Sequence, residues 1–159
     1  MAFNARDLAV NGVRALQPYQ PGKPVEELER ELGLSDIVKL ASNENPRTSN
    51  EVIAKALAQQ QSDISRYPDG SGYALKIRLS DLLGVSTDQL TLGNGSNDVL
   101  ELLVRAFVCP GQGVVVSEHS FAVYSLAASA VGADLKTAPA RSWGHDLEAI
   151  LSLVDQNTR

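Results

Sequence analysis

The second half of this sequence predicts an α/β fold in which a mostly parallel sheet is flanked by helices. Three short apolar segments read as strands, at residues 90–92, 114–116 and 135–139. Each is followed by a helical pattern, at residues 98–107, 121–131 and 146–154. Strands that alternate with amphipathic helices are typical of a parallel sheet. The run Val114–Val116 has no polar residue, which is expected when both faces of a strand are covered.

Apolar spacing predicts the side of each helix that is buried. We expect an inward face on the helix at 98–107, made of Val99, Leu103, Ala106 and Phe107. On the helix at 146–154 the aligned residues are Leu147, Ile150, Leu151 and Val154. Gly132 is expected to end the helix at 121–131.

The first half is less regular. Three prolines predict an extended arm over residues 17–24. Val25–Leu32 reads as a helix ended by Gly33, and Ile37–Leu40 as a short strand. Two further helices are predicted, one that begins at Asn50 and one that ends near Gly84. Polar turns are predicted at residues 42–46 and 67–72, before each of these helices.

Composition limits the class of protein. The chain has 159 residues, 43% of them hydrophobic, and a net charge of -5, which is ordinary for a soluble globular protein. The acidic balance argues against nucleic acid or a membrane as a partner. Because Cys109 is the only cysteine, we expect no intramolecular disulfide and no cysteine-rich metal site. The N-terminus lacks the apolar core of a signal peptide, so a cytoplasmic location is expected.

A glycine-rich loop between the strand at 90–92 and the next helix suits a phosphate. Gly93 and Gly95 let the backbone turn tightly and approach a ligand. The following helix start offers unpaired N–H groups, with Ser96 and Asn97 as added donors. The same residues could equally serve only as a helix cap.

Two familiar phosphate loops can be tested against this segment. A Walker loop is excluded because no lysine follows the glycines. The dinucleotide fingerprint fits better, since Gly93 and Gly95 match and Glu118 lies near the end of the next strand. Asp98, however, replaces the third glycine. A nicotinamide-binding oxidoreductase domain therefore remains an alternative.

Three further segments carry residues that could line a site. Phe121 and Tyr124 follow the strand at 114–116, where an aromatic ring could cover a planar cofactor or simply belong to the core. His119 lacks a visible catalytic partner, and His145 lies in a polar loop beside Trp143. Two turns could also contribute side chains, around Asn43 and around Tyr67.

In this order, five segments resemble histidinol-phosphate aminotransferase, a fold-type I enzyme that depends on pyridoxal 5′-phosphate (PLP). The segments are Pro18-Tyr19-Gln20-Pro21-Gly22-Lys23-Pro24, Leu40-Ala41-Ser42-Asn43-Glu44-Asn45-Pro46, Arg66-Tyr67-Pro68-Asp69-Gly70, Gly93-Asn94-Gly95-Ser96-Asn97-Asp98 and Glu118-His119-Ser120-Phe121-Ala122-Val123-Tyr124. One departure is the sequence Arg47-Thr48-Ser49-Asn50, where relatives usually have a Gly-Pro pair.

The resemblance implies roles for individual residues. Gly95 and the N–H groups of Ser96 and Asn97 would hold the PLP phosphate, and Phe121 would stack on the pyridine ring. Tyr67 would donate its hydroxyl to the PLP phosphate of the neighbouring subunit. The resemblance also implies that Tyr19 and Asn43 would line the substrate side of the site.

The resemblance also implies an activity and an assembly. The complete enzyme would be a homodimer with small-molecule substrates, transferring the amino group of L-histidinol phosphate to 2-oxoglutarate. Another class I/II aminotransferase is an alternative. The fold would be aspartate aminotransferase-like, with residues 1–45 as arm and part of the small domain, and residues 46–159 as the first part of the large domain. The lysine that binds PLP covalently is expected beyond Arg159, so this chain is interpreted as an inactive fragment without a catalytic residue or a metal site.

Overall fold

The computed structural model describes residues 5–45, 47 and 50–159. They form two compact units. The sheet unit combines the N-terminal residues up to Tyr19 with Thr91–Arg159, and the helical unit is Gln20–Leu90. The division expected between residues 45 and 46 stays a prediction.

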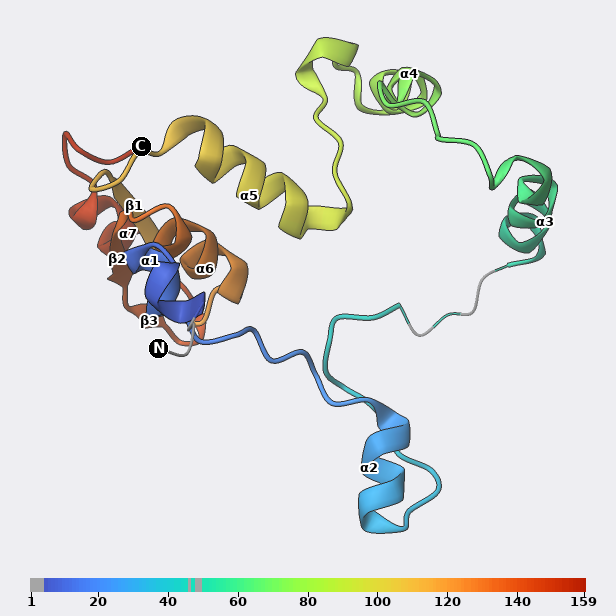
Figure 1. Ribbon diagram of the computed structural model, residues 1–159, viewed down its shortest axis with the longest axis horizontal. Coiled ribbons are helices and arrows are strands. Elements are labelled where there is room, and N and C mark those ends of the chain that lie inside the picture. Colours follow the sequence, from blue (N-terminus) through green and yellow to red (C-terminus); the bar gives the residue numbers. More distant parts are fainter. Residues whose placement is uncertain (1–4, 46, 48–49) are drawn as a thin grey trace. The chain divides into compact units, whose positions relative to one another are not determined.

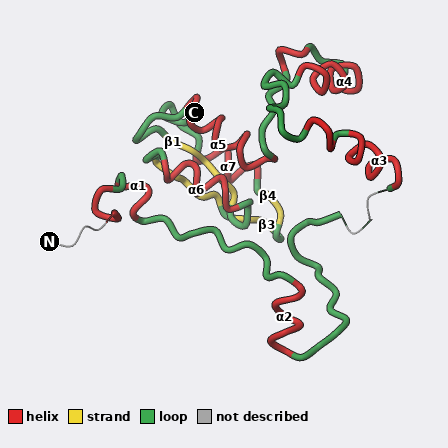
Figure 2. Tube along the Cα trace, turned by 45° about the vertical axis from the view of Figure 1, so that its right-hand side comes forward, coloured by secondary structure: helices red, strands yellow, loops and turns green. Residues whose placement is uncertain are grey.

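The sheet unit has the predicted alternation of strands and helices. Its main elements are α5 (Gly95–Phe107), β1 (Gly113–Ser117), α6 (Ala122–Ala130), β2 (Asp134–Ala138) and α7 (Leu147–Leu153). β1 and β2 pair in parallel, from Gly113 opposite Asp134 to Ser117 opposite Ala138. Strands are yellow in Figure 2, where β1 is labelled. The parallel α/β arrangement predicted from the sequence is confirmed.

A small core lies between α6 and the sheet. Its buried apolar residues are Val116, Val123, Ala127, Ala128 and Ala138. The alanines let the helix backbone approach the strands closely. No helix in the described part of the chain is both long enough and apolar enough to cross a membrane.

The inward faces predicted for α5 and α7 are wrong in part. Leu103 and Phe107 on α5 are about half and two-thirds exposed, and Leu147 and Leu151 on α7 are more than 70% exposed. Ala106 and Val154 are exposed as well. The apolar pattern holds, but among the described residues no element covers these faces.

The N-terminal segment packs on α6. A 3₁₀ turn at Ala5–Leu8 leads into α1 (Asn11–Arg14), which lies beside α6 in Figure 1. A Cβ atom at Gly12 would overlap the carbonyl oxygen of Ser129 on α6. Only glycine therefore allows this close approach of the two backbones.

A short hairpin follows β2 where the sequence suggests a polar loop. β3 (Ala140–Arg141) and β4 (Gly144–His145) pair antiparallel. The two turn residues, Ser142 and Trp143, have φ of 51° and 66°. Asn-Gly is the usual signal for such a turn, and neither of these residue types occupies the two turn positions.

The two other predicted strands do not form. Residues 37–40 and 90–92 form no strand, although Leu90 has extended backbone angles. A strand requires a neighbour for its hydrogen bonds, and no described segment pairs with either one.

The helical unit contains α2 (Val25–Leu32), α3 (Glu51–Gln59) and α4 (Tyr73–Leu83), and the described residues of the loops between them form no strand (Figure 2). The predicted helix ends are confirmed. Gly33 and Gly84 have left-handed φ of 64° and 68°, and the Asn50 side chain accepts a bond from the Ile53 N–H. Residues 17–24 have no regular structure, as expected for an extended arm.

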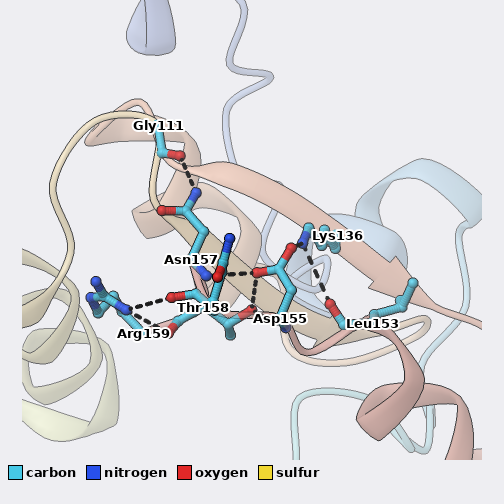
Figure 3. A network of polar contacts seen from close by, with 8 residues as sticks. Gly111, Lys136, Leu153, Asp155, Asn157, Thr158 and Arg159 are labelled. Carbon is cyan, nitrogen blue, oxygen red and sulfur yellow. Dashed lines mark hydrogen bonds and ion pairs between the residues drawn. The ribbon is translucent and has the colours of Figure 1, made fainter.

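The last residues of the chain pair with the edge of β1 that β2 leaves free. Gly113 donates its N–H to the Asn157 carbonyl and accepts the Arg159 N–H, both at 3.0 Å, so that Thr158 forms a parallel bridge with Gly113. Figure 3 shows the polar network of this segment, in which the Asn157 amide donates to the Gly111 carbonyl at 2.8 Å.

Candidate functional site

The glycine loop ends at the first residue of α5. Gly95 has φ of 77°, a left-handed conformation that glycine adopts without strain. Ser96 and Asn97, the next two residues, are exposed. None of the hydrogen bonds among the described residues uses the backbone N–H of either one. These two donors, at the positive end of a 13-residue helix, are free to bind an anion.

The Asp98 carboxylate does not occupy this position. Its Oδ2 atom accepts the backbone N–H of Asn94 at 3.1 Å. This hydrogen bond ties the glycine loop to the first turn of α5 and leaves the N–H groups of Ser96 and Asn97 free. Gly93 makes room for this arrangement. A Cβ there would lie 2.9 Å from Val99 Cγ2 and 3.0 Å from Asp98 Oδ2. Gly93 thus serves packing, whereas Gly95 serves backbone conformation.

Phe121 lies at the start of α6 and contacts the N-terminal segment. Its ring centroid is 6.2 Å from that of Tyr19, with the ring planes at 84°. Phe121 is 40% exposed and Tyr19 is 50% exposed, so both side chains remain partly accessible. The structure therefore brings together two predicted site residues that are far apart in the sequence.

A groove of about 490 Å³ is lined by both Tyr19 and Asn97. We call it the arm groove, and its lining residues are Val13, Leu16, Gln17, Pro18, Tyr19, Asn97, Glu101, Arg105, Val123, Leu126, Ala127, Ala130 and Val131. Most of the lining is apolar, and Glu101 and Arg105 form an ion pair at 3.8 Å on its α5 side. Through Asn97 the arm groove reaches the start of α5.

The carboxyl end of β1 is closed by Glu118 and His119. Glu118 Oε2 accepts the Ala140 N–H at 3.1 Å, which fastens the β3–β4 hairpin. His119 has φ of 60°, and its ring stacks on Trp143 with centroids 4.9 Å apart. Glu118, which the dinucleotide alternative would place on a ribose, already has a structural partner. No signal in the sequence predicts these contacts, because they link two turns that are separate along the chain.

Tyr67 and Asn43 belong to the helical unit. The Tyr67 side chain is fully exposed beside a hollow that includes Leu57 and Ile64. Asn43 is exposed and has a left-handed φ of 43°, as expected for the predicted turn. Pro46, Thr48 and Ser49, which belong to the predicted turn and to the departure from the family pattern, lie outside the described residues.

Asp69 organises the loop after Tyr67. Its carboxylate accepts the backbone N–H groups of Ser71 and Tyr73, each at 2.9 Å, and the Ser71 hydroxyl. Together these hydrogen bonds lower the pKa of Asp69, and the bond from the Ser71 N–H is the largest cause. The negative charge thereby faces the start of α4, where the helix dipole favours it.

Three of the five lysines are held in ion pairs. Lys39 lies 3.2 Å from Glu44, Lys136 lies 2.5 Å from Asp155, and Lys23 pairs with Glu27 and Glu31. The hydrogen bond with Glu31 is the main cause that raises the pKa of Lys23. A lysine nucleophile needs the neutral amine, so these pairs oppose that role. The described residues also contain no cluster of three or more His, Cys, Asp or Glu that could hold a metal ion.

Comparison with known proteins decides the family. The sequence model of aminotransferase class I and II matches residues 35–159. The chain belongs to this family. It is similar to histidinol-phosphate aminotransferase 2 of Pseudomonas fluorescens Pf0-1, with 53% identity over all of this chain and 44% of that protein. The protein of the same name in Nitrosospira multiformis is 51% identical over 99% of this chain and 41% of its own length.

Solved structures agree on the fold of this aminotransferase chain. Histidinol-phosphate aminotransferase from Sinorhizobium meliloti, crystallised with PLP, matches with a TM-score of 0.78 and 26% identity, over 92% of this chain and 39% of that one. Aspartate aminotransferase from Thermotoga maritima matches with a TM-score of 0.65 and 19% identity, over 84% of this chain and 38% of that one. The predicted aspartate aminotransferase-like fold is confirmed. The chain spans less than half the length of the curated relatives it matches.

Proposed function

We propose that this chain is part of a PLP-dependent aminotransferase that moves the amino group of L-histidinol phosphate to 2-oxoglutarate, giving imidazole acetol phosphate and L-glutamate. The observation that carries this proposal is the 51–53% identity, over essentially the whole chain, with proteins named histidinol-phosphate aminotransferase. Family membership also supports the aminotransferase class over the dinucleotide alternative.

The start of α5 fits the phosphate of PLP. The free N–H groups of Ser96 and Asn97 would bind its oxygens, and the left-handed Gly95 aims the helix start at the ligand. The Asp98 carboxylate is turned toward the Asn94 N–H, so the two donors stay accessible. Phe121, which is 40% exposed, would cover one face of the pyridine ring with its own ring.

When bound, PLP supplies an electron sink for the carbanion formed at the substrate Cα, and the protein orients both molecules. The residues of this chain have binding and orienting roles. Tyr19 and Asn43 would line the substrate side, and Tyr67 would reach the PLP phosphate of a partner subunit in a homodimer. The covalent role of a lysine is assigned to none of the five lysines present.

Nuclear magnetic resonance of the ¹⁵N-labelled chain tests the phosphate site. We expect titration with PLP to shift the amide signals of Ser96 and Asn97 first, and inorganic phosphate to shift the same two more weakly. NAD is the control ligand for the dinucleotide alternative and should leave them unchanged. Shifts confined to other residues, or a stronger response to NAD than to PLP, would overturn the proposed cofactor site.

A further inference from the structure

We propose that residues 11–19 form a strap along α6 that fixes the position of Phe121, with Tyr19 as the positioning residue. This inference rests on the proposed function, in which the ring of Phe121 stacks on PLP. It gives the ring of Tyr19 a positioning role in addition to the place on the substrate side proposed for this residue.

The strap is held at both ends of α6. Near the end of the helix, the backbone of Gly12 lies against the Ser129 carbonyl so closely that no side chain fits between them. Near its start, Tyr19 contacts Phe121 edge to face. The segment therefore runs antiparallel to α6. Eight residues of helix rise about 12 Å, a distance that seven residues of the strap span easily.

Tyr19 is the contact that limits the ring of Phe121. Phe121 precedes the first residue of α6, has non-helical backbone angles and is 40% exposed, so the helix itself does not bury its side chain. Among the described residues, Tyr19 is the only aromatic side chain in ring contact with it. An edge-to-face pair has a defined geometry, so this contact sets the tilt of the Phe121 ring.

The strap also reaches the phosphate donors. Gln17, Pro18 and Tyr19 line the arm groove together with Asn97, whose N–H is one of the two free donors of α5. One segment thus borders both the residue expected under the pyridine ring and a residue expected at the phosphate. A displaced strap should change how PLP is oriented as well as how tightly it binds.

Three variants of the purified chain test the strap. Tyr19→Leu removes the edge-to-face contact, Tyr19→Phe keeps the ring without the hydroxyl, and Gly12→Ala pushes the strap from α6 without touching either ring. Tyr73→Leu is the control, because this tyrosine is 68% exposed and belongs to the helical unit. Amide signals of β1 check that each variant keeps its sheet.

Two readouts separate the strap from the cofactor site. Without any ligand, we expect nuclear Overhauser contacts between Tyr19 and Phe121 in the unmodified chain and in Tyr19→Phe, and their loss in Tyr19→Leu and Gly12→Ala. In PLP titrations followed by visible circular dichroism, the same two variants should bind roughly 2- to 12-fold more weakly, with a reduced signal per bound PLP. Tyr19→Phe and the control should bind within about twofold of the unmodified chain.

The outcomes are distinguishable. If the unmodified chain binds no PLP, the proposed cofactor site fails, and the ligand-free contacts alone decide the strap. The strap is overturned if Tyr19→Leu and Gly12→Ala leave the Phe121 ring signals unchanged. It is also overturned if Tyr19→Phe weakens PLP binding as much as Tyr19→Leu, because the hydroxyl would then be the acting group.

Discussion

The Nζ atom of Lys136 on β2 lies 2.5 Å from Oδ2 of Asp155, in the turn that follows α7. Lys136 also donates to the Leu153 carbonyl at 3.4 Å (Figure 3). The other carboxylate oxygen of Asp155 accepts the Asn157 N–H and the Thr158 hydroxyl. This one carboxylate therefore joins β2 to the segment that pairs with β1.

The Asp155 contacts predict a pH-dependent attachment of the last residues. The hydrogen bond from Lys136 is the main cause that lowers the pKa of Asp155 from 3.8 to about 2. Because the folded-state pKa is depressed, the stabilisation is complete above about pH 4 and is lost as the pH falls through 2. In this pH range the amide chemical shifts of Gly113 and Arg159 should move toward the values of N–H groups that are not hydrogen-bonded.

Asp155→Asn should weaken the attachment at neutral pH and remove this pH dependence. A pH profile unchanged in Asp155→Asn would contradict the prediction.

Gly93→Ala should disturb the start of α5. The added Cβ would crowd Val99 and Asp98, so the bond between the Asp98 carboxylate and the Asn94 N–H should break. We expect a loss of about 1–3 kcal/mol in local stability, as for other overpacked sites, measured by amide hydrogen exchange at Asn94 and along α5. Gly70→Ala is the matched control, because its Cβ would meet no atom within 4 Å. Equal effects of the two substitutions would show that packing at Gly93 is unimportant.

Tyr67→Phe tests the proposed homodimer in the complete protein. The Tyr67 side chain is fully exposed, which leaves its hydroxyl available to a partner subunit. Loss of one hydrogen bond to a phosphate should weaken PLP retention by about 1–3 kcal/mol, measured by PLP release during dialysis. Light scattering gives the oligomeric state. A monomer that retains PLP at high protein concentration would exclude the role across subunits.

These 159 residues alone are expected not to transaminate. Lys23, Lys39 and Lys136 are held in ion pairs, and a solvated lysine is protonated at neutral pH, which makes it a poor nucleophile. Borohydride reduction in the presence of PLP, followed by peptide mapping, should give no stoichiometric modification at a single lysine. One fully modified lysine together with turnover of histidinol phosphate would refute this prediction.

Short sequence signals predicted those features whose conformation depends mainly on neighbouring residues, such as helix ends. Gly33 ends α2 at the expected residue, since a left-handed residue after a helix favours glycine. The strand predicted at 37–40 failed because extended backbone becomes a strand only beside a partner, which is a non-local condition. The hairpin was missed because Ser142 and Trp143 adopt a turn that their residue types do not favour.

In the candidate site, too, the features that depend on neighbouring residues could be predicted, and the contacts between distant segments could not. The phosphate loop could be predicted because two glycines, a helix start and its free N–H groups are contiguous in the sequence. The contact between Tyr19 and Phe121 could not be predicted, because it depends on how α1 lies on α6. Family resemblance named both residues, but only the structure brings their rings together.

The stack of His119 on Trp143 has a practical consequence, because Trp143 is the only tryptophan in the chain. Intrinsic tryptophan emission observes a single location, the junction between the turn after β1 and the β3–β4 hairpin. The helical unit contributes no indole at all, so its unfolding is silent to this probe. Far-ultraviolet circular dichroism, in contrast, weighs every helix of both units. The two optical signals therefore follow different parts of the same molecule, and a melting curve from either one describes only its own part.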